Sequence, residues 1–400
     1  MGNWRELELP RFKDKPGWEF TELKGFDLAS YETAGVGDLV AADQAELVFD
    51  LPADGVRMTQ VDGAWHPVEE AESDPPAPLV MPLSQAVESH GDLVDKYLGS
   101  VVGSDENVFT ARNAAEWEGG AFVYVPAGVK VEAPIVLTAV QATEQTAMNW
   151  RVLVVLEDGA EAEVWEQYAS TAPGLFTTVV ELVVGQNASL RFVSGQGLDL
   201  GSWIFGTQRA KVQRDANLDW VVLGFGAANG KVFQNTILEG PGATGKVTGA
   251  YALDGRQHLD FDTTQEHAAP NCVSDLAFRG ILSGRSSAVW RGMIKVDPGA
   301  QQTDAFQESR NLLLTKKAHA DAIPGLEILA NDVRCTHAAA IAQIDPDQLY
   351  YLRSHGLSHD VAARLVIEGF LAELVERFEE GPVRDALAGA LERRLSAVLG

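Results

Sequence analysis

The sequence predicts a mainly β protein whose central part is a β-helix, with helical regions before and after it. From about residue 110 to 335, strand-like runs rich in Val, Ile, Phe and Trp follow one another with almost no helical periodicity. Small-residue turn pairs recur at a nearly constant interval, and they are Gly159-Ala160, Asn187-Ala188, Ala216-Asn217 and Gly242-Ala243. A steady period of roughly 26 to 29 positions indicates stacked coils, an elongated architecture that accommodates a long chain without a single oversized core.

A β-sandwich or jelly roll is the alternative all-β fold. Either would need closely spaced hairpin turns, for which Asn-Gly and Asp-Gly are the strongest signals. The long strand-like region has few such pairs, among them Asp158-Gly159 and Asp254-Gly255. Their scarcity favours the β-helix, which we assign to residues 111–344.

Residues 1–110 form a mixed, partly helical N-terminal region in this interpretation. The stretch EEAESDPPAPLVMP (69–82) is acidic and proline-rich, which is typical of an exposed connection. The following run LSQAVESHGDLVDKYLGSVV (83–102) carries apolar residues at helical spacing. We therefore expect a small helical cap before the β-helix.

Residues 345–400 form a C-terminal helical domain. Asp345 can cap a helix that begins with Pro346 and stops at Gly356, and Ser358 can cap the next helix. A third helix places apolar residues at steps of four: Val383, Leu387, Leu391 and Leu395. This much apolar surface requires a cover, and both the β-helix and a partner protein are candidates for it.

Charge and cysteine content exclude several functions. A net charge of −26 repels nucleic acids and anionic lipid, so we expect neither as a partner. Two cysteines are too few for a secreted disulfide framework, which indicates a reducing compartment. The start MGNWRELELP lacks a signal-peptide pattern, and no apolar run is long enough to span a membrane. We expect a soluble, cytoplasmic protein.

Familiar catalytic motifs are missing, including GxxxxGK[ST], HExxH and GxSxG. A β-helix polysaccharide lyase or hydrolase would need clustered carboxylates. The nearest candidates are Asp260 and Asp262, which alternate onto one face with His258. A solvated outer face explains the same pattern, and we assign no catalytic residue.

The run NDVRCTHAAAIAQID (331–345) places Cys335 two positions before His337. On a strand, these side chains share one face about 7 Å apart, where sulfur and nitrogen suit iron, copper or a persulfide. The alternative is two half-buried strand residues. Because a cluster takes about four protein ligands, a chain with two distant cysteines would share it with another chain or hold it transiently.

Several long stretches, in order along the chain, together carry a family resemblance. One is the C-terminal run LEILANDVRCTHAAAIAQIDPDQLYYLRSHGLSHDVAARLVIEGFLAELVERF. The others are PGWEFTELKGFDL, EHAAPNCVSDLAFRGILSGRSSAVWRGMIKV and ESRNLLLTKKAHADAIPGLEI. These stretches resemble the SufB/SufD family of iron-sulfur cluster assembly scaffolds, with the first as its C-terminal hallmark, and the similarity spans nearly the whole chain.

The resemblance implies a right-handed parallel β-helix with helical flanks and no catalytic turnover by this chain. It implies pairing with SufB through the end of the β-helix, where a transient iron-sulfur cluster is made beside Cys335 and His337. It also implies that the ATPase SufC docks on the C-terminal helices and hydrolyses ATP there. Apolar candidates for the SufC contact are Leu365, Phe370 and Leu374.

Two positions indicate the SufD branch. Ala318 stands where SufB-like members carry a cysteine, and Ala338 follows His337 where they carry Glu. The leading prediction is therefore a SufD-like scaffold subunit of a SufBCD complex. A SufB-like or homodimeric scaffold of the same family is the first alternative, and the isolated chain is a candidate homodimer.

Overall fold

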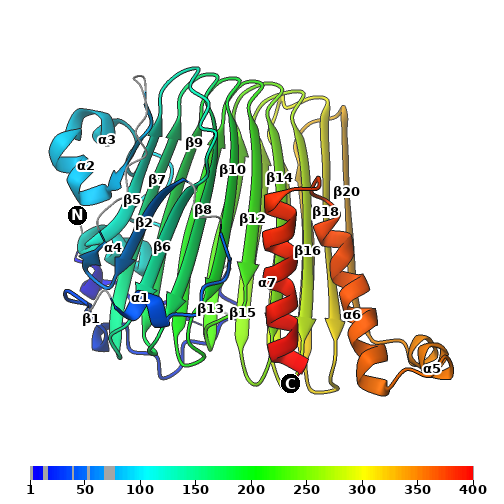
Figure 1. The fold of residues 1–400 in the computed structure, drawn as a ribbon. Coiled ribbons are helices and arrows are strands. Elements are labelled where there is room, and N and C mark those ends of the chain that lie inside the picture. The colour runs from blue at the N-terminus through cyan, green and yellow to red at the C-terminus, as the bar shows by residue number, and fades with distance from the viewer. Residues whose placement is uncertain (1–2, 12–16, 38–39, 52–54, 67–76, 400) are drawn as a thin grey trace.

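The computed structural model describes residues 3–11, 17–37, 40–51, 55–66 and 77–399. Its main feature is a pair of largely parallel sheets stacked face to face, which together form a β-helix (Figure 1). One sheet contains β1 (Glu32–Thr33), β4 (Leu79–Pro82), β5 (Gly119–Val125), β7 (Thr146–Leu156), β9 (Leu175–Val184), β11 (Trp203–Val212), β13 (Asn229–Leu238), β15 (His258–His267), β17 (Ser287–Val296) and β19 (His319–Ile328). We call it the odd sheet, after the numbers of its long strands.

The second sheet, which we call the even sheet, is built from the long strands that alternate with these along the chain. It contains β2 (Val56–Val61), β3 (Ala64–Trp65), β6 (Ile135–Gln141), β8 (Glu161–Ser170), β10 (Ser189–Gly197), β12 (Asn217–Gly224), β14 (Thr244–Leu253), β16 (Val273–Leu282), β18 (Thr303–Leu313) and β20 (Val333–Gln343). Each coil therefore takes one strand from each sheet. The mainly β, parallel β-helix predicted from the sequence is confirmed.

Strand register gives the coil length directly. Ala147 lies opposite Leu175, and Leu175 lies opposite Trp203, so these successive coils have equal lengths. A side-chain hydrogen bond from Thr177 to Asn149 joins equivalent positions of neighbouring coils, with a sequence separation of 28. Near the C-terminal end Ser287 lies opposite His319, which makes that coil longer. The predicted repeat thus holds for the middle coils and lengthens in the last ones.

A ladder of small buried residues marks one turn of successive coils. Each small residue of this ladder, here called a rung, is preceded by a residue with a left-handed backbone, the conformation that Gly, Asn and Asp tolerate best. These preceding residues are Gly159, Asn187, Asp215, Gly242 and Asn271. The rungs are fully buried, and they are Ala160, Ala188, Ala216, Ala243 and Cys272. Cys272 therefore takes an alanine position in the ladder, where burial raises the pKa of its thiol.

The helices lie at the two ends of the β-helix and against the outer faces of both sheets. They are η1 (Trp4–Glu6), η2 (Leu28–Ser30), α1 (Ala41–Gln44), α2 (Leu83–Ser89), α3 (Gly91–Tyr97), α4 (Val108–Glu116), α5 (Pro346–Ser354), α6 (His359–Val375) and α7 (Pro382–Leu399). The expected helical cap is present as α2 and α3, although residues before it also supply β2, β3 and β4 to the sheets. The predicted exposed connection at 69–82 lies mostly outside the described residues.

An N-terminal segment, residues 17–31, covers part of the outer face of the odd sheet. Trp18 packs against Phe205 and Phe233, with ring centroids 6.1 and 5.7 Å apart. Thr21 donates a hydrogen bond of 2.7 Å to Asp260 on β15. This segment therefore bridges several coils that are distant from it in sequence.

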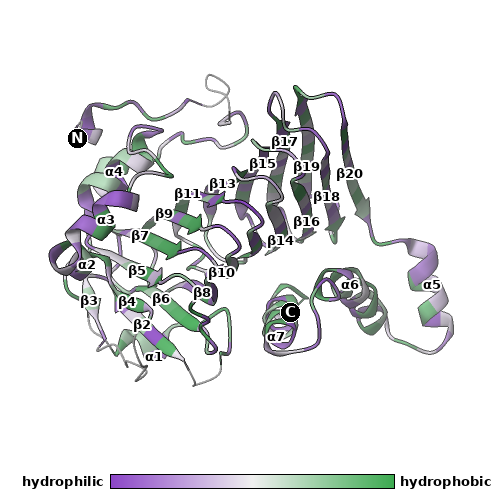
Figure 2. Ribbon diagram, turned by 90° about the horizontal axis from the view of Figure 1, so that it is seen from above, coloured by the Kyte–Doolittle hydropathy of each residue, from purple (hydrophilic) through white to green (hydrophobic). Residues whose placement is uncertain are grey.

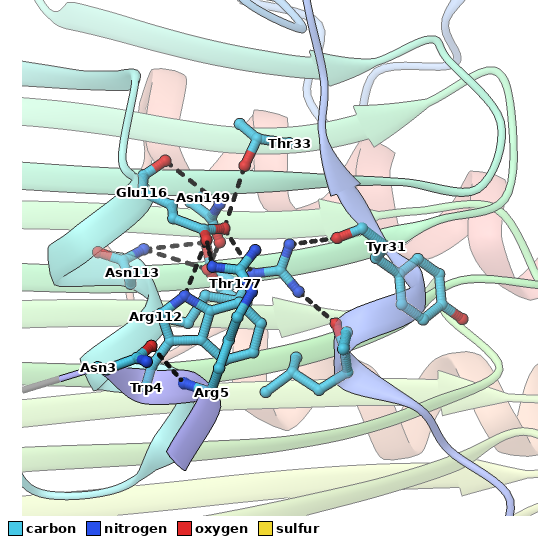
Figure 3. A network of polar contacts seen from close by, with 12 residues as sticks. Asn3, Trp4, Arg5, Tyr31, Thr33, Arg112, Asn113, Glu116, Asn149 and Thr177 are labelled. Atoms are coloured by element: carbon cyan, nitrogen blue, oxygen red, sulfur yellow. Dashed lines mark hydrogen bonds and ion pairs between the residues drawn. The ribbon is translucent and has the colours of Figure 1, made fainter. Parts of the chain in front are cut away.

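Arg112 of α4 holds the end of this segment (Figure 3). Its side chain is fully buried and donates to the backbone carbonyls of Leu28 and Tyr31. Its Nε also bonds Glu116 at 3.2 Å, and Trp4 Nε1 donates to the same carboxylate at 2.8 Å. One buried guanidinium thus joins the N-terminal segment to the helix that precedes β5.

Helices α6 and α7 lie against the outer face of the even sheet, while α5 projects beyond the last coil (Figure 2). Their inward residues share one apolar cluster with Val193, Val221 and Ile281 of the sheet. A polar contact also holds the helices against the sheet, because Arg377, just after α6, forms an ion pair with Asp275 of β16 at 3.1 Å. The β-helix therefore covers much of the apolar surface of the C-terminal helices.

Helix ends follow the sequence prediction closely. Asp345 caps α5 by accepting from Asp347 N at 2.9 Å, and Ser358 caps α6 by accepting from Val361 N at 3.3 Å. Gly356, with a left-handed φ of +93°, follows the end of α5. No helix in the described part of the chain is both long and apolar enough to cross a membrane.

Candidate functional site at the open end of the β-helix

The last coil, formed by β19 and β20, ends the β-helix without a cap. Within the described residues, β19 pairs only with β17 and β20 only with β18. The other edge of each strand carries free N–H and C=O groups, which is the usual template for adding a strand from another chain. We call this surface the open end.

Cys335 and His337 lie on β20 and face into the coil. The register pairs Cys335 with Ala305 and His337 with Gln307, and both partners on β18 are buried in the interior. Because side chains at paired positions of neighbouring strands share a face, the thiol and imidazole point into the same interior layer. With no coil above them, Cys335 is half-buried and His337 is exposed.

Apolar side chains surround this pair. Leu326 and Ile328 on β19 are 38% and 39% exposed, Leu329 is 54% exposed, and Ile341 on β20 is 45% exposed. In the preceding coil, the positions paired with Leu326 and Ile328 are Ile294 and Val296, which are fully buried. The open end therefore exposes apolar side chains at positions that are buried in the preceding coil, and an exposed apolar surface of this kind is typical of a contact site.

Charged groups near Cys335 and His337 change the pKa of the Cys335 thiol. Arg334 forms an ion pair with Asp304, and this hydrogen bond lowers the pKa of the Asp304 carboxyl. Burial raises the pKa of the Cys335 thiol, and the negative charge of Asp304 raises it further. The free chain therefore keeps Cys335 protonated at neutral pH, which is the less reactive form.

The described residues contain no group of three or more His, Cys, Asp or Glu side chains placed to hold a metal ion. Cys335 and His337 supply two donor atoms, fewer than the four or so protein ligands of a stable cluster. Further ligands for iron or sulfur at the open end would come from a second molecule.

Asp260 and Asp262, the carboxylates considered for a lyase or hydrolase, do not line an open groove. Lys231 Nζ lies 2.9 Å from Asp260, and both side chains are buried beneath the N-terminal segment. Burial also raises the pKa of Asp262. These groups form an ionic cluster that holds the segment in place. Sequence patterns missed Lys231 because its contact depends on the register between β13 and β15.

The three apolar candidates on α6 differ in accessibility. Leu365 is 45% exposed, whereas Leu374 is 3% exposed and faces the even sheet. Phe370 is half-buried, with the guanidinium of Arg279 5.9 Å from its ring. The accessible apolar surface of these helices also includes side chains that the sequence did not single out: Tyr350, Tyr351 and Val361. Tyr350 and Tyr351 are exposed because α5 projects beyond the sheets and has no buried residue, and Val361 lies near the exposed start of α6.

The fold and the open end together define a β-helix protein with an uncapped, apolar last coil. Comparison with known proteins specifies the family. Residues 138–370 match the family described as SUF system FeS cluster assembly, SufBD core domain, and residues 52–137 match the SufBD protein N-terminal region.

Similar proteins agree with this assignment. The chain is 35% identical to the iron-sulfur cluster assembly protein SufD of Bacillus subtilis (strain 168), over 98% of this chain and 91% of that protein. It is 27% identical to an iron-sulfur cluster assembly SufBD family protein of Staphylococcus aureus (strain USA300), over 72% of this chain and 62% of that protein. The chain belongs to the SufBD family of iron-sulfur cluster assembly proteins, and within it the chain is SufD-like.

Proposed function

We propose that this chain is the SufD-like scaffold subunit of a cytoplasmic SufBCD complex. In this role it pairs with SufB through the open end and binds the ATPase SufC through its C-terminal helices. The iron-sulfur cluster is a transient product shared with SufB, and ATP hydrolysis takes place in SufC. This chain itself performs no catalytic turnover.

The open end is the observation that carries the proposal. Two unpaired strand edges supply backbone hydrogen-bonding groups, and the exposed apolar side chains supply area to bury on association. Cys335 and His337 lie inside this same surface. A partner that adds strands there would bring its own ligands to the thiol and imidazole, which alone are too few to hold a cluster.

The SufC contact rests on a second surface. Helix α5 has no buried residue, and its Tyr350 and Tyr351 are 75% and 63% exposed. Leu365 on α6 adds to the apolar area. An amphipathic helical surface of this kind fits a groove on a partner protein, and we narrow the proposed contact to Leu365 with these two tyrosines and Val361.

The direct test is reconstitution. A tagged copy of this chain is co-expressed with SufB and SufC, and the purified material is assayed for both partners, for iron and for acid-labile sulfide. We expect all three chains to co-purify, and cluster formation to fall when this chain is left out. Full cluster formation by SufB and SufC alone, or failure of the folded chain to bind either partner, would contradict the proposal.

The isolated chain offers the same open end to a second copy. We therefore expect a homodimer in the absence of SufB, with SufB displacing the second copy when it is added. Size-exclusion chromatography with light scattering distinguishes the two states.

A further inference from the structure

Gln307 lies beside His337 on the neighbouring strand, and its side-chain amide joins the two sheets. It is on β18, paired in register with His337 on β20, and its side chain is completely buried. Its Nε2 donates to the carbonyl of Gly292 at 3.2 Å and to that of Gly325 at 3.1 Å. The amide thus reaches across the interior from the even sheet to the odd sheet.

These two bonds settle the orientation of the amide. Backbone carbonyls only accept hydrogen bonds, so the group between them must be the NH₂ and the other atom must be the oxygen. Gly292 belongs to the penultimate coil and Gly325 to the last one, so the amide lies at the boundary between the two coils. A Cβ at position 292 would lie 2.2 Å from the Trp290 ring and 2.6 Å from Gln307 Oε1, and glycine leaves that space free.

The oxygen of Gln307 has no hydrogen-bond partner although it is buried. A buried acceptor without a partner is unfavourable by about 1–3 kcal/mol and calls for an explanation. The neighbouring imidazole, one strand away on the same face, is a donor without a partner among the described residues. The exposed imidazole faces solvent while the open end is free, and a docked partner would exclude that solvent.

We propose that Gln307 is a positioning residue for His337: on pairing, Gln307 Oε1 accepts a hydrogen bond from one imidazole N–H. This bond fixes the ring and its tautomer, so that the lone pair of the second nitrogen faces the partner and the nascent cluster. Histidines that bind metals are oriented in this way by an acceptor on their other nitrogen. The inference rests on the proposed role of His337 in cluster assembly.

The first test is structural and does not depend on cluster chemistry. In a high-resolution structure of this chain paired with SufB, we expect Gln307 Oε1 within hydrogen-bonding distance, about 2.7–3.2 Å, of a His337 ring nitrogen. An imidazole turned away from Gln307, or an Oε1 bonded to another group, would overturn the proposal.

The second test is kinetic and uses Gln307→Met with Gln265→Met as the matched control. Gln265 is an interior glutamine of β15, 1% exposed, whose Oε1 also has no partner and which lies two coils away from the last one. We expect Gln307→Met to slow cluster formation by about tenfold or more in the assembled complex, and Gln265→Met to leave the rate unchanged. Equal rates for the two variants would contradict the role of Gln307.

A double variant separates this inference from the proposed function. If Gln307 acts through His337, then Gln307→Met adds no further slowing to His337→Ala. Independent, multiplicative slowing would show that Gln307 acts elsewhere. If His337→Ala alone leaves the rate unchanged, the proposed role of the histidine fails, and the structural test still decides whether the hydrogen bond forms.

Discussion

The indole N–H of Trp150 donates a hydrogen bond of 2.8 Å to Glu166 Oε1 inside the β-helix, and both side chains are fully buried. Burial raises the pKa of Glu166 to about 7, although the hydrogen bonds of Tyr168 and Trp150 oppose this rise. The second oxygen, Oε2, has no partner. The native state therefore keeps this carboxyl protonated to a much higher pH than the unfolded chain does.

Glu166 should make the protein less stable as the pH rises. The unfolded carboxyl loses its proton near 4.5 and the native one near 7, so the proton-linked stabilisation is complete below 4.5 and is lost between 4.5 and about 7. At about 1.4 kcal/mol per pKa unit this amounts to about 3 kcal/mol. Urea unfolding at several pH values should show this loss in the wild type but not in Glu166→Gln. Glu163→Gln on the outer face is the control, and an identical pH profile for wild type and Glu166→Gln would refute the assignment.

Replacing Arg112 by methionine should destabilise the N-terminal segment. The change leaves the carbonyls of Leu28 and Tyr31 without their buried donor and removes one of the partners of Glu116, a loss of about 3 kcal/mol. Arg5, which contacts Glu116 from a 60% exposed position, is the matched control, and Arg5→Met should change the unfolding free energy by less than about 1 kcal/mol. Hydrogen exchange should be faster in residues 17–31 of the Arg112 variant alone. Unchanged exchange there would argue against this anchoring role.

A charge at the open end should prevent pairing without unfolding the chain. Ile341 is 45% exposed on β20, so Ile341→Lys should change stability by only about 0.5 kcal/mol. It should weaken SufB binding at least tenfold, because a lysine would be buried without a partner in the complex. Leu200→Lys, at a 58% exposed position away from the last coil, is the control. Normal SufB binding by the Ile341 variant in a titration would locate the interface elsewhere.

The proposed SufC contact should respond to Leu365→Asp. The comparable change Val87→Asp places the same charge on an exposed position of helix α2. We expect loss of SufC co-purification for the first variant and retention for the second, with both melting within a few degrees of the wild type. These point substitutions are more informative than deletion of residues 346–400, which would expose the apolar face of the even sheet. SufC binding by a folded Leu365→Asp variant would exclude this contact.

His337→Ala should impair cluster formation more than stability, because the exposed imidazole makes no contact on which the free chain depends. Cys335→Ala removes a half-buried thiol that packs against the apolar cluster containing Ala305, so a modest loss of stability is expected. Thermal unfolding, SufB binding and cluster formation are measured separately for each variant. A wild-type rate of cluster formation in an assembled His337→Ala complex would show that this histidine has no role in cluster assembly.

The features that could be predicted from the sequence are those set by neighbouring residues, namely the turns and the helix ends. Turn residues with left-handed backbones set the coil period, and the caps at Asp345 and Ser358 set the starts of α5 and α6. The sequence did not predict that Leu374 faces the sheet while Leu365 faces solvent, because α6 is apolar over a broad surface and periodicity alone does not select the packed side. The same limit applies to Lys231 and Gln307, since each contact depends on the register between strands of different coils.

The regular stacking of coils, marked by the ladder of small buried residues, sets distances within the complex. Each coil advances the β-helix by the spacing of neighbouring strands, about 4.8 Å, and α6 and α7 are fixed to strands β16 and β14 in its C-terminal half. The number of coils therefore sets the separation between the open end, the C-terminal helices and the N-terminal cap. Insertion of one further coil before β14 would move the cap away from the other two surfaces by about 5 Å. It would also separate Arg393 of α7 from Val48 and Asp50, with which it forms hydrogen bonds. Insertion after β18 would instead separate the open end from the C-terminal helices, so the two insertions would change different distances within the complex.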